Sequence, residues 1–324
     1  MKTIAVLTSG GDAPGMNAAI RAVVRTGCQN GMRVLGIRRG FNGLMNGDMY
    51  EMNLRSVSDI INRGGTILYS ARSPEFKTDE GLNRALRVCK ENSIDGIVII
   101  GGDGSFRGAR DLSLKGVPCI GIPGTIDNDI ACCDYTIGYD TAMNTVMEMV
   151  DRIRDTTESH DRCSVVEVMG RRAGYIALNA GIAVGATSIL IPEVEFDIDK
   201  DVIETMQKTQ RTDKKHFIVM VAEGVSEKIG GVERLTKYIE EKTGVESRAT
   251  ILGHVQRGGS PSLRDRLVGS QMGNYAVHIL MEGKGNRVVA MQKEQILDFD
   301  IYEALNMTKS IDLGLYKTAL EISI

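Results

Sequence analysis

The stretch VPCIGIPGTIDND, residues 117–129, runs from an apolar segment directly into a polar loop. Residues 117–122 have the length and composition of a buried strand, so the loop leaves the carboxyl end of that strand. Within the loop, Asp127 and Asp129 lie two residues apart, beside Thr125 and among small residues. Two carboxylates placed in this way suit phosphoryl transfer, in which one accepts a proton from a hydroxyl and the other helps to hold either a metal-bound phosphate or the attacking oxygen. Proline, glycine, asparagine and aspartate are also the commonest turn residues, so a plain turn explains the loop equally well.

Two other apolar runs end in glycine loops of the same kind. They are TIAVLTSGGDAPGMN (residues 3–17) and IDGIVIIGGDGS (residues 94–105), and a helical pattern follows the first. Glycines let backbone N–H groups approach a phosphate closely, and the start of a helix adds partial positive charge. Asp103, inside the second loop, suits a magnesium ligand. Because the carboxyl ends of parallel strands lie along one edge of a sheet, we expect the three loops to share that edge and to bind phosphates there.

The second half of the chain repeats the alternation of strand, glycine loop and helix. Strands are expected at residues 164–168, 217–221 and 287–291. A loop with arginines and glycines, MGRRAG (residues 169–174), follows the first of these strands, and a second loop of this kind, GHVQRGG (residues 253–259), follows a further strand expected just before it. Arginine meets phosphate oxygens two at a time, so such loops are suited to bind phosphates. The pattern predicts an α/β protein with mainly parallel sheets.

Length and composition fit a globular protein of two domains. The chain has 324 residues, of which 42% are apolar and 25% charged, and its net charge of -3 gives no overall attraction to nucleic acid or to a membrane. Its six cysteines lack the spacing of a zinc or redox motif, which predicts free thiols in a reducing cytoplasm.

The first seven residues are too short an apolar run for a signal peptide. Residues 175–191 are also too short and too interrupted for a membrane span, and they predict a buried helix followed by a strand. Residues 57–61 are expected to end a helix.

Taken in order, five motifs resemble those of the bacterial phosphofructokinase family over nearly the whole chain. They are the Gly10-Gly11 loop and residues 101–105, 123–129, 169–174 and 253–259. The resemblance implies two αβα (Rossmann-like) domains with mainly parallel sheets. Residues 1–138 and 256–306 would bind ATP, and residues 139–255 and 307–324 would bind fructose 6-phosphate.

The same resemblance implies transfer of the γ-phosphoryl group of ATP to the 1-hydroxyl of D-fructose 6-phosphate. Asp127 would be the general base, assisted by Thr125 and Asp129, and Asp103 would hold Mg²⁺. The groups that would stabilise charge on the transferred phosphoryl are Arg171, Arg72 and the backbone N–H of Gly11. The residues that would contact ATP are Gly11, Arg72, Ser73, Gly102, Asp103, Gly104 and Ser105.

Binding of the sugar phosphate is implied for residues from several loops. They are Thr125, Ile126, Asp127, Arg162, Met169, Gly170, Arg171, Glu223, Arg248, His254, Val255, Gln256 and Arg257. In the family, Arg162 and Arg248 reach in from a neighbouring subunit, so the resemblance also implies a homotetramer. Members that use pyrophosphate carry aspartate where Gly104 stands and lysine where Gly124 stands, so these two glycines imply that ATP is the donor.

A second site, for the effectors ADP or phosphoenolpyruvate, is implied where subunits meet in regulated relatives. The matching residues are Arg21, Arg25, Arg154, Gly185, Thr187, Lys214, Lys215 and His216. Thr187 stands where those relatives have an acidic residue that helps to hold the magnesium of ADP, and Leu54 and Thr212 stand where basic residues are usual. A hydroxyl does not replace the charge of a carboxylate toward Mg²⁺, so we expect weakened activation by ADP.

Three other kinds of protein share parts of this pattern. A nicotinamide-dependent oxidoreductase also alternates strands, glycine loops and helices, but the glycines at positions 102, 104 and 108 miss the GxGxxG spacing by one residue. A non-catalytic nucleotide sensor would be expected to lose Asp127 or the arginines. Lipid and NAD kinases share the GGDG loop but lack a counterpart of residues 253–259. No GxxxxGK[ST] motif of a P-loop occurs.

Overall fold

The computed structural model describes residues 1–323, and the chain divides into two compact units. The first unit comprises residues 1–126, 130–141 and 257–309, and the second comprises residues 127–129, 142–256 and the C-terminal residues from 310. Each unit has a mainly parallel β-sheet with helices packed against it. The predicted fold class, an α/β protein with mainly parallel sheets in two αβα (Rossmann-like) domains, is confirmed.

The sheet of the first unit has seven strands in the order β11-β10-β5-β4-β1-β2-β3. Its inner strands are parallel to one another, and they are β1 (Thr3–Ser9), β2 (Arg33–Ile37), β4 (Gly96–Gly101), β5 (Cys119–Pro123) and β10 (Arg287–Gln292). The antiparallel edge strands are β3 (Met49–Met52) and β11 (Gln295–Asp300). Every residue of β1, β4 and β5 is buried, because helices cover both faces of the sheet.

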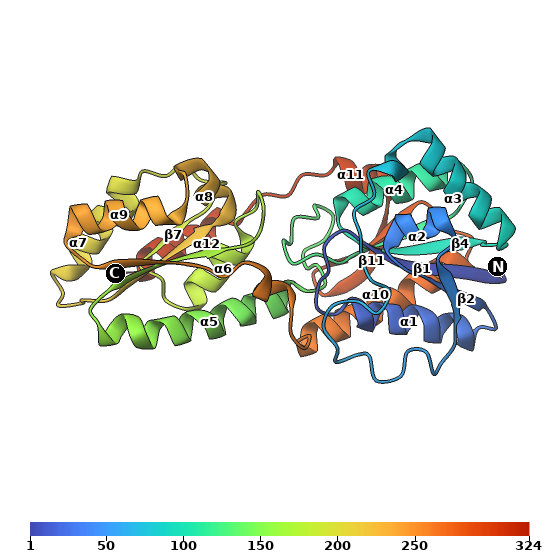
Figure 1. The fold of residues 1–324 in the computed structure, drawn as a ribbon, viewed down its shortest axis with the longest axis horizontal. Helices are drawn as coiled ribbons and strands as arrows, with labels where there is room; N and C mark the ends of the chain where they lie inside the picture. Colours follow the sequence, from blue (N-terminus) through green and yellow to red (C-terminus); the bar gives the residue numbers. More distant parts are fainter. Residues whose placement is uncertain (324) are drawn as a thin grey trace. The chain divides into compact units, whose positions relative to one another are not determined.

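Helices lie on both faces of this sheet (Figure 1). On one face are α1 (Met16–Gln29) and α10 (Leu263–Met281), and on the other are α3 (Asp79–Glu91) and α4 (Asp103–Leu114). A Cβ atom at Gly273 would lie 2.5 Å from the carbonyl oxygen of Ala19, so α1 and α10 pack with their backbones in close approach. The remaining short helices of the unit are η1 (Glu75–Lys77), α2 (Gly40–Asn46) and α11 (Ile301–Asn306).

The sheet of the second unit has four parallel strands in the order β7-β8-β6-β9. The strands are β6 (Cys163–Val168), β7 (Ser188–Leu190), β8 (Phe217–Ala222) and β9 (Ser247–Ile251). The helices around them are α5 (Tyr139–Ser159, from residue 142 onward), α6 (Tyr175–Ala183), η2 (Asp199–Glu204), α7 (Thr205–Gln210), α8 (Glu223–Ile229), α9 (Val232–Thr243), η3 (Gly253–Arg257, up to residue 256) and α12 (Leu313–Ile322). Helix α6 followed by β7 confirms the buried helix and strand predicted for residues 175–191.

Within residues 1–323, no helix is both long and apolar enough to cross a bilayer.

The prediction that a helix ends at residues 57–61 is wrong, because this segment forms successive turns. The side chain of Asn53 accepts hydrogen bonds from the backbone N–H groups of Arg55 (2.8 Å) and Ser56 (3.1 Å), which closes a turn in place of a helical start. Asp59 then adopts a left-handed conformation with φ of 55°. A non-glycine residue in that region interrupts a right-handed helix.

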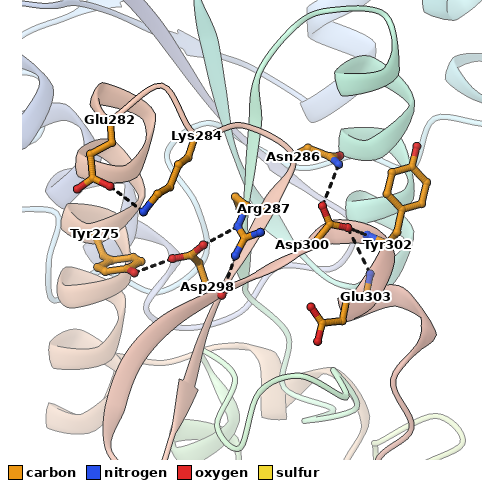
Figure 2. A network of polar contacts seen from close by, with 9 residues as sticks. All are labelled: Tyr275, Glu282, Lys284, Asn286, Arg287, Asp298, Asp300, Tyr302 and Glu303. Atoms are coloured by element: carbon orange, nitrogen blue, oxygen red, sulfur yellow. Dashed lines mark hydrogen bonds and ion pairs between the residues drawn. The ribbon is translucent and has the colours of Figure 1, made fainter.

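Strands β10 and β11 form a hairpin held by a network of polar side chains (Figure 2). One oxygen of Asp298 accepts a hydrogen bond from the Tyr275 hydroxyl (2.6 Å) and the other from Arg287 Nε (2.5 Å). The Asp298 side chain is only 9% exposed, whereas the neighbouring pair of Lys284 and Glu282 (2.8 Å) is about half exposed on both sides. Burial opposes the ionisation of Asp298, but the hydrogen bonds from Tyr275 and Arg287 outweigh it and lower its pKa.

Substitution of Asp298 by asparagine is expected to lower the free energy of unfolding by about 1–3 kcal/mol at pH 7, because charged hydrogen bonds in a buried position are lost. The pKa of Asp298 in the folded chain is lowered. The stabilisation is therefore present above about pH 4, the ordinary pKa of the unfolded side chain, and is lost as the pH falls through the folded-state pKa. Denaturant unfolding of both proteins between pH 7 and pH 3 should show the difference shrinking in acid. Glu282→Gln, in the exposed pair, serves as the control and should cost much less, because exposed ion pairs contribute little to stability.

Candidate active site

Three glycine loops leave neighbouring strands of the first unit at the same level. In the register of the sheet Ser9 of β1 lies opposite Gly101 of β4, and Gly101 lies opposite Pro123 of β5. The backbone N–H of Gly124 donates to the carbonyl oxygen of Gly101 (3.0 Å). The prediction that these loops share one edge of a parallel sheet is therefore confirmed, and this edge is where ligands bind in open α/β sheets.

The loop after β1 is held against an arginine. A Cβ atom at Gly11 would lie 2.8 Å from a terminal nitrogen of Arg257, so the guanidinium packs directly against this glycine. The same nitrogen donates to the carbonyl oxygen of Asp12 (3.2 Å), and the hydroxyl of Ser70 donates to the carbonyl oxygen of Gly10 (2.6 Å). The loop thus has fixed contacts on two sides and lies against a guanidinium.

The loop after β4 opens directly into helix α4. Gly102 is the N-cap and Asp103 the first helical residue, so the first turn directs its free N–H groups toward the sheet edge. Ser105 is buried and its hydroxyl donates to the carbonyl oxygen of Ser9 (3.2 Å), which ties the first two loops together. Around a Cβ built at Gly104, no atom of residues 1–323 lies within 4 Å apart from the adjoining residues and the nearby backbone of α4 itself. This position is therefore open at the helix start, where an anion is favoured.

Asp103 is the candidate metal ligand. Its carboxylate is half exposed and lies 3.0 Å from Arg107 Nε, one turn further along α4. Within residues 1–323 no cluster of three or more histidine, cysteine, aspartate or glutamate side chains could hold a metal ion on its own. A single carboxylate at a phosphate-binding helix start fits Mg²⁺, which is commonly held by one or two carboxylates together with substrate phosphates and water.

Arg72 and Ser73 lie in the same unit, in the segment before η1. The Arg72 side chain is exposed, and the Ser73 hydroxyl accepts a hydrogen bond from the backbone N–H of Phe76 (3.3 Å). Arg72 is therefore free of the core and able to move toward a ligand.

The loop after β5 is closed at its base. The carbonyl oxygen of Pro123 accepts from the N–H of Ile137 (2.9 Å), and the carbonyl oxygen of Thr125 accepts from the Thr136 hydroxyl (2.6 Å). Thr125 and Ile126 are buried. The two arms of the loop thus lie side by side.

Asp127 belongs to the second unit, where it meets Arg171. Its side chain is fully buried, and its Oδ2 atom lies 3.2 Å from Nε of Arg171, whose side chain is half exposed. Arg171 has a left-handed backbone with φ of 54°, an uncommon conformation for arginine that often marks functional positions. A buried carboxylate beside a guanidinium that faces solvent is suited to accept a proton from a bound hydroxyl. Asp129, two residues on, is exposed.

Glu223, the first residue of α8, lies beside this pair. Its carboxylate accepts a hydrogen bond from the backbone N–H of Arg171. Burial raises the pKa of Glu223, the hydrogen bond from Arg171 opposes the rise, and the negative charge of Asp127 adds to it. Two carboxylates and one arginine thus lie close together at the carboxyl ends of β6 and β8.

Met169, Gly170 and Gln256 also lie at this end of the second sheet. The Gln256 side chain is fully buried, accepting from the N–H of Met169 (3.2 Å) and donating to the carbonyl oxygen of Gly253 (3.1 Å). It therefore joins the segment after β6 to η3. His254 and Val255, in η3, are exposed.

Arg162 and Arg248 lie at the opposite end of that sheet. Arg162 precedes β6 and Arg248 is the second residue of β9, and both contact the carboxylate of Glu246, at 2.9 Å for Arg162. Met169 follows the far end of β6, a strand of six residues that spans about 20 Å. Within one chain these two arginines are thus separated from the other sugar-phosphate candidates.

The effector candidates fall into two groups. Arg21 and Arg25 lie one turn apart on α1 of the first unit, and burial together with the charge of Arg25 lowers the pKa of Arg21. In the second unit Arg154 donates to the carbonyl oxygen of Val184, and burial and the charge of Arg154 lower the pKa of Lys214. The other members of this group are Gly185, with φ of 60°, Lys215, which is exposed, and His216, which is half-buried.

Thr187 differs from the charged members of this group. Its side chain is 2% exposed, and within residues 1–323 its hydroxyl has no hydrogen-bond partner. A buried polar atom without a hydrogen-bond partner costs free energy of folding. Packing and stability alone therefore do not explain a threonine at position 187.

Asp265 and Tyr135 were missed by reasoning from the sequence. In the sequence, Ser262 and Asp265 form an S-x-x-D pattern that predicts only a helix cap. In the structure, Asp265 accepts hydrogen bonds from the Tyr135 hydroxyl (3.0 Å) and from the N–H of Gly138 (2.7 Å), in the loop that follows β5. No local sequence signal links residues 130 positions apart.

The fold and the site together define an α/β protein with phosphate-binding loops at the carboxyl ends of its parallel strands. A family model described as phosphofructokinase matches residues 3–280. Over 323 residues the chain is 56% identical to the ATP-dependent 6-phosphofructokinases of Clostridium tetani (strain Massachusetts / E88) and Clostridium botulinum (strain Loch Maree / Type A3), with 100% of each chain covered. The chain therefore belongs to the phosphofructokinase family.

Solved structures agree with this assignment. The phosphofructokinase from Saccharomyces cerevisiae matches with a TM-score of 0.89 and 35% identity, covering 100% of this chain, which spans 48% of the yeast chain. The pyrophosphate-dependent phosphofructokinase from Marinobacter aquaeolei has a TM-score of 0.87 at 22% identity and covers 100% of this chain and 92% of that one. The second likeness shows that the fold is shared.

Proposed function

We propose that the chain transfers the γ-phosphoryl group of ATP to the 1-hydroxyl of D-fructose 6-phosphate, giving fructose 1,6-bisphosphate and ADP. The observation that carries the proposal is the fully buried Asp127 beside the Arg171 guanidinium, in a chain that is 56% identical over its whole length to ATP-dependent 6-phosphofructokinases. An assay that couples fructose 1,6-bisphosphate formation to NADH oxidation tests it directly. Absence of turnover with these two substrates would contradict the proposal.

In this proposal the first unit binds the nucleotide. Backbone N–H groups of Gly11 and of the α4 start would hold phosphates, with Gly102, Asp103, Gly104 and Ser105 in that turn. Arg72 and Ser73 would contact ATP from the segment before η1, where the Arg72 side chain is exposed. When bound, Mg²⁺ would neutralise phosphate charge, and Asp103 would hold it. The domain boundaries inferred from the family are part of this proposal.

In the second unit, the sugar hydroxyl would be activated by Asp127. Its carboxylate accepts the proton as the oxygen attacks phosphorus, and Arg171 stabilises the charge that develops on the transferred group. Thr125 and Asp129 would assist Asp127, and Glu223 would accept a hydrogen bond from a sugar hydroxyl. The remaining contacts to the sugar phosphate are assigned to Ile126, Met169, Gly170, His254, Val255, Gln256 and Arg257.

The sugar 6-phosphate would also be bound by a second copy of the chain. Arg162 and Arg248 lie at the amino ends of β6 and β9, about 20 Å along the strands from Met169 and Glu223. They can complete a sugar-phosphate site only on a neighbouring copy, which supports the proposed homotetramer. Sedimentation at working concentrations measures the assembly directly. A cytoplasmic location is proposed with it, and the six free cysteine thiols suit that compartment.

The choice of donor is expected to depend on Gly104. Gly104→Asp should lower kcat/KM for ATP on the order of 10–100-fold, because a carboxylate would face the phosphates at the start of α4. The added side chain meets open space, so the fold should be unaffected. Gly104→Ala adds the Cβ without charge and is the matched control. Equal losses in both variants would show that bulk and not charge is responsible, and turnover of the wild type with pyrophosphate at the ATP rate would contradict the assignment of ATP.

Regulation by ADP is proposed to be weak because of Thr187. Thr187→Glu should strengthen the weak activation of the wild type by magnesium-ADP, since a carboxylate can help to hold the cation. The measurement is fructose 6-phosphate saturation with and without ADP and phosphoenolpyruvate. Because Thr187 is buried, the melting temperature of the variant is measured in parallel. Strong activation of the wild type that Thr187→Glu leaves unchanged would contradict the proposal.

A further inference from the structure

We propose that Asp265 is a positioning residue that, through the Tyr135 hydroxyl, fixes the loop of residues 124–138 and thereby sets kcat. This inference rests on the proposed function, because that loop carries Thr125 and Asp127. Neither Asp265 nor Tyr135 has a place among the substrate contacts above.

Asp265 accepts hydrogen bonds from the second half of the loop and the start of α5, residues 135–141. Its Oδ1 atom accepts from the Tyr135 hydroxyl (3.0 Å) and the Gly138 N–H (2.7 Å), and its Oδ2 atom accepts from the N–H (2.9 Å) and the hydroxyl of Thr141. The Tyr135 hydroxyl in turn accepts from the N–H of Asp140 (3.0 Å). Asp265 is fully buried, and a charge in that position is tolerated only with such partners.

The same half of the loop, at residues 132–134, is hydrogen-bonded to the end of β10 and the residue that follows it. The N–H of Asp134 donates to the carbonyl oxygen of Met291 (2.8 Å), and the Asp134 carboxylate accepts from the N–H of Lys293 (2.9 Å). The side chain of Gln292 donates to the carbonyl oxygen of Cys132 (3.1 Å). With the bonds from Ile137 and Thr136 to the other arm, the return segment has fixed contacts to β5, β10 and α10.

The orientation of Asp265 is not that of an ordinary helix cap. In a capping box the acidic side chain would accept from the N–H of Ser262. Here that N–H donates to the Thr141 hydroxyl (3.0 Å), and the carboxylate faces the loop instead. Buried charges are often replaceable by apolar groups without loss of stability, so stability alone does not account for a charge in this position. A role in holding the reacting groups in alignment would account for the buried charge, because small displacements of these groups lower the rate by large factors.

The test is Tyr135→Phe, compared with Tyr275→Phe as a matched control. Both changes remove one hydroxyl bonded to an aspartate, Asp265 in the first case and Asp298 in the second. The phenylalanine at 135 keeps the ring over which the Arg264 guanidinium lies (4.5 Å). We expect Tyr135→Phe to lower kcat on the order of tenfold with KM for ATP unchanged, and to speed amide exchange in residues 124–138. Both variants should lower the melting temperature by a similar amount, because each loses one hydrogen bond to an aspartate. Tyr275→Phe, however, should leave kcat as in the wild type.

A second pair of variants tests the contact between Asp265 and Thr141 of α5. Thr141→Val removes the hydroxyl that Asp265 binds and should lower kcat, whereas Thr141→Ser restores the hydroxyl and should recover most of it. A wild-type kcat in Tyr135→Phe would overturn the inference, as would equal losses of kcat in Tyr135→Phe and Tyr275→Phe. The proposed function fails separately, if Asp127→Asn retains wild-type turnover or if fructose 6-phosphate is not phosphorylated.

Discussion

Replacement of Asp127 by asparagine is expected to lower kcat by a factor on the order of 10²–10⁴ while changing KM for ATP little. A general base acts as the proton moves in the transition state, so its loss affects the chemical step more than the binding of the donor. Asparagine has nearly the same shape as aspartate, and its amide cannot accept the proton. Initial rates over a matrix of ATP and fructose 6-phosphate concentrations separate kcat from the two KM values.

Two controls accompany this variant. Circular dichroism and the melting temperature establish that the fold is kept, because Asp127 is fully buried. Asp111→Asn makes the same chemical change in an ion pair with Arg110 (2.8 Å) on α4 and should leave kcat unaltered. A wild-type kcat in Asp127→Asn would exclude the assignment of the base.

Arg171→Ala is expected to lower kcat by a factor on the order of 10²–10³, the usual cost of losing one preorganised donor to transition-state charge. The Arg171 guanidinium lies 3.2 Å from Asp127 with its side chain half exposed, so it can contact both the base and a bound phosphoryl group. Arg171→Lys keeps the charge but loses the planar fork, and its kcat should fall between those of the wild type and Arg171→Ala. Single-turnover rates at saturating substrates measure the chemical step.

Arg172→Ala is the matched control for Arg171→Ala, since Arg172 is the next residue and is also exposed. It should keep kcat within about twofold of the wild type, as is usual for surface substitutions away from a site. Equal losses in the two variants would mean that the whole segment is disturbed and would remove the special role of Arg171.

The fold could be predicted from the sequence where local pattern and burial agree. Strands β1, β4 and β5 are buried along their whole length, so each appears as a mainly apolar run, and a glycine or proline ends β4 and β5 and directly follows β1. Those ends mark the loops, and the parallel arrangement then places the loops at one edge. For this reason the sequence alone marks Gly11, Asp103 and Asp127 as site candidates.

Other elements had no such signal. The turn between β10 and β11 has two consecutive residues with positive φ, Lys293 (48°) and Glu294 (63°), where Asn-Gly would be the usual sequence. The segment of residues 57–61 was mistaken for a helix because the Asn53 turn that precedes it depends on a side-chain hydrogen bond. The partnership of Asp265 and Tyr135 arises only when α10 and the loop after β5 are brought together by the fold.

The position of Arg162 and Arg248 at the amino ends of β6 and β9 has a consequence for how the enzyme is handled. If a neighbouring copy supplies these two cations, the specific activity depends on the enzyme concentration itself. Dilution below the dissociation constant of the assembly would then raise KM for fructose 6-phosphate before any chain unfolds. Added fructose 6-phosphate would oppose this loss, because a ligand that binds only the assembled form draws the equilibrium toward it.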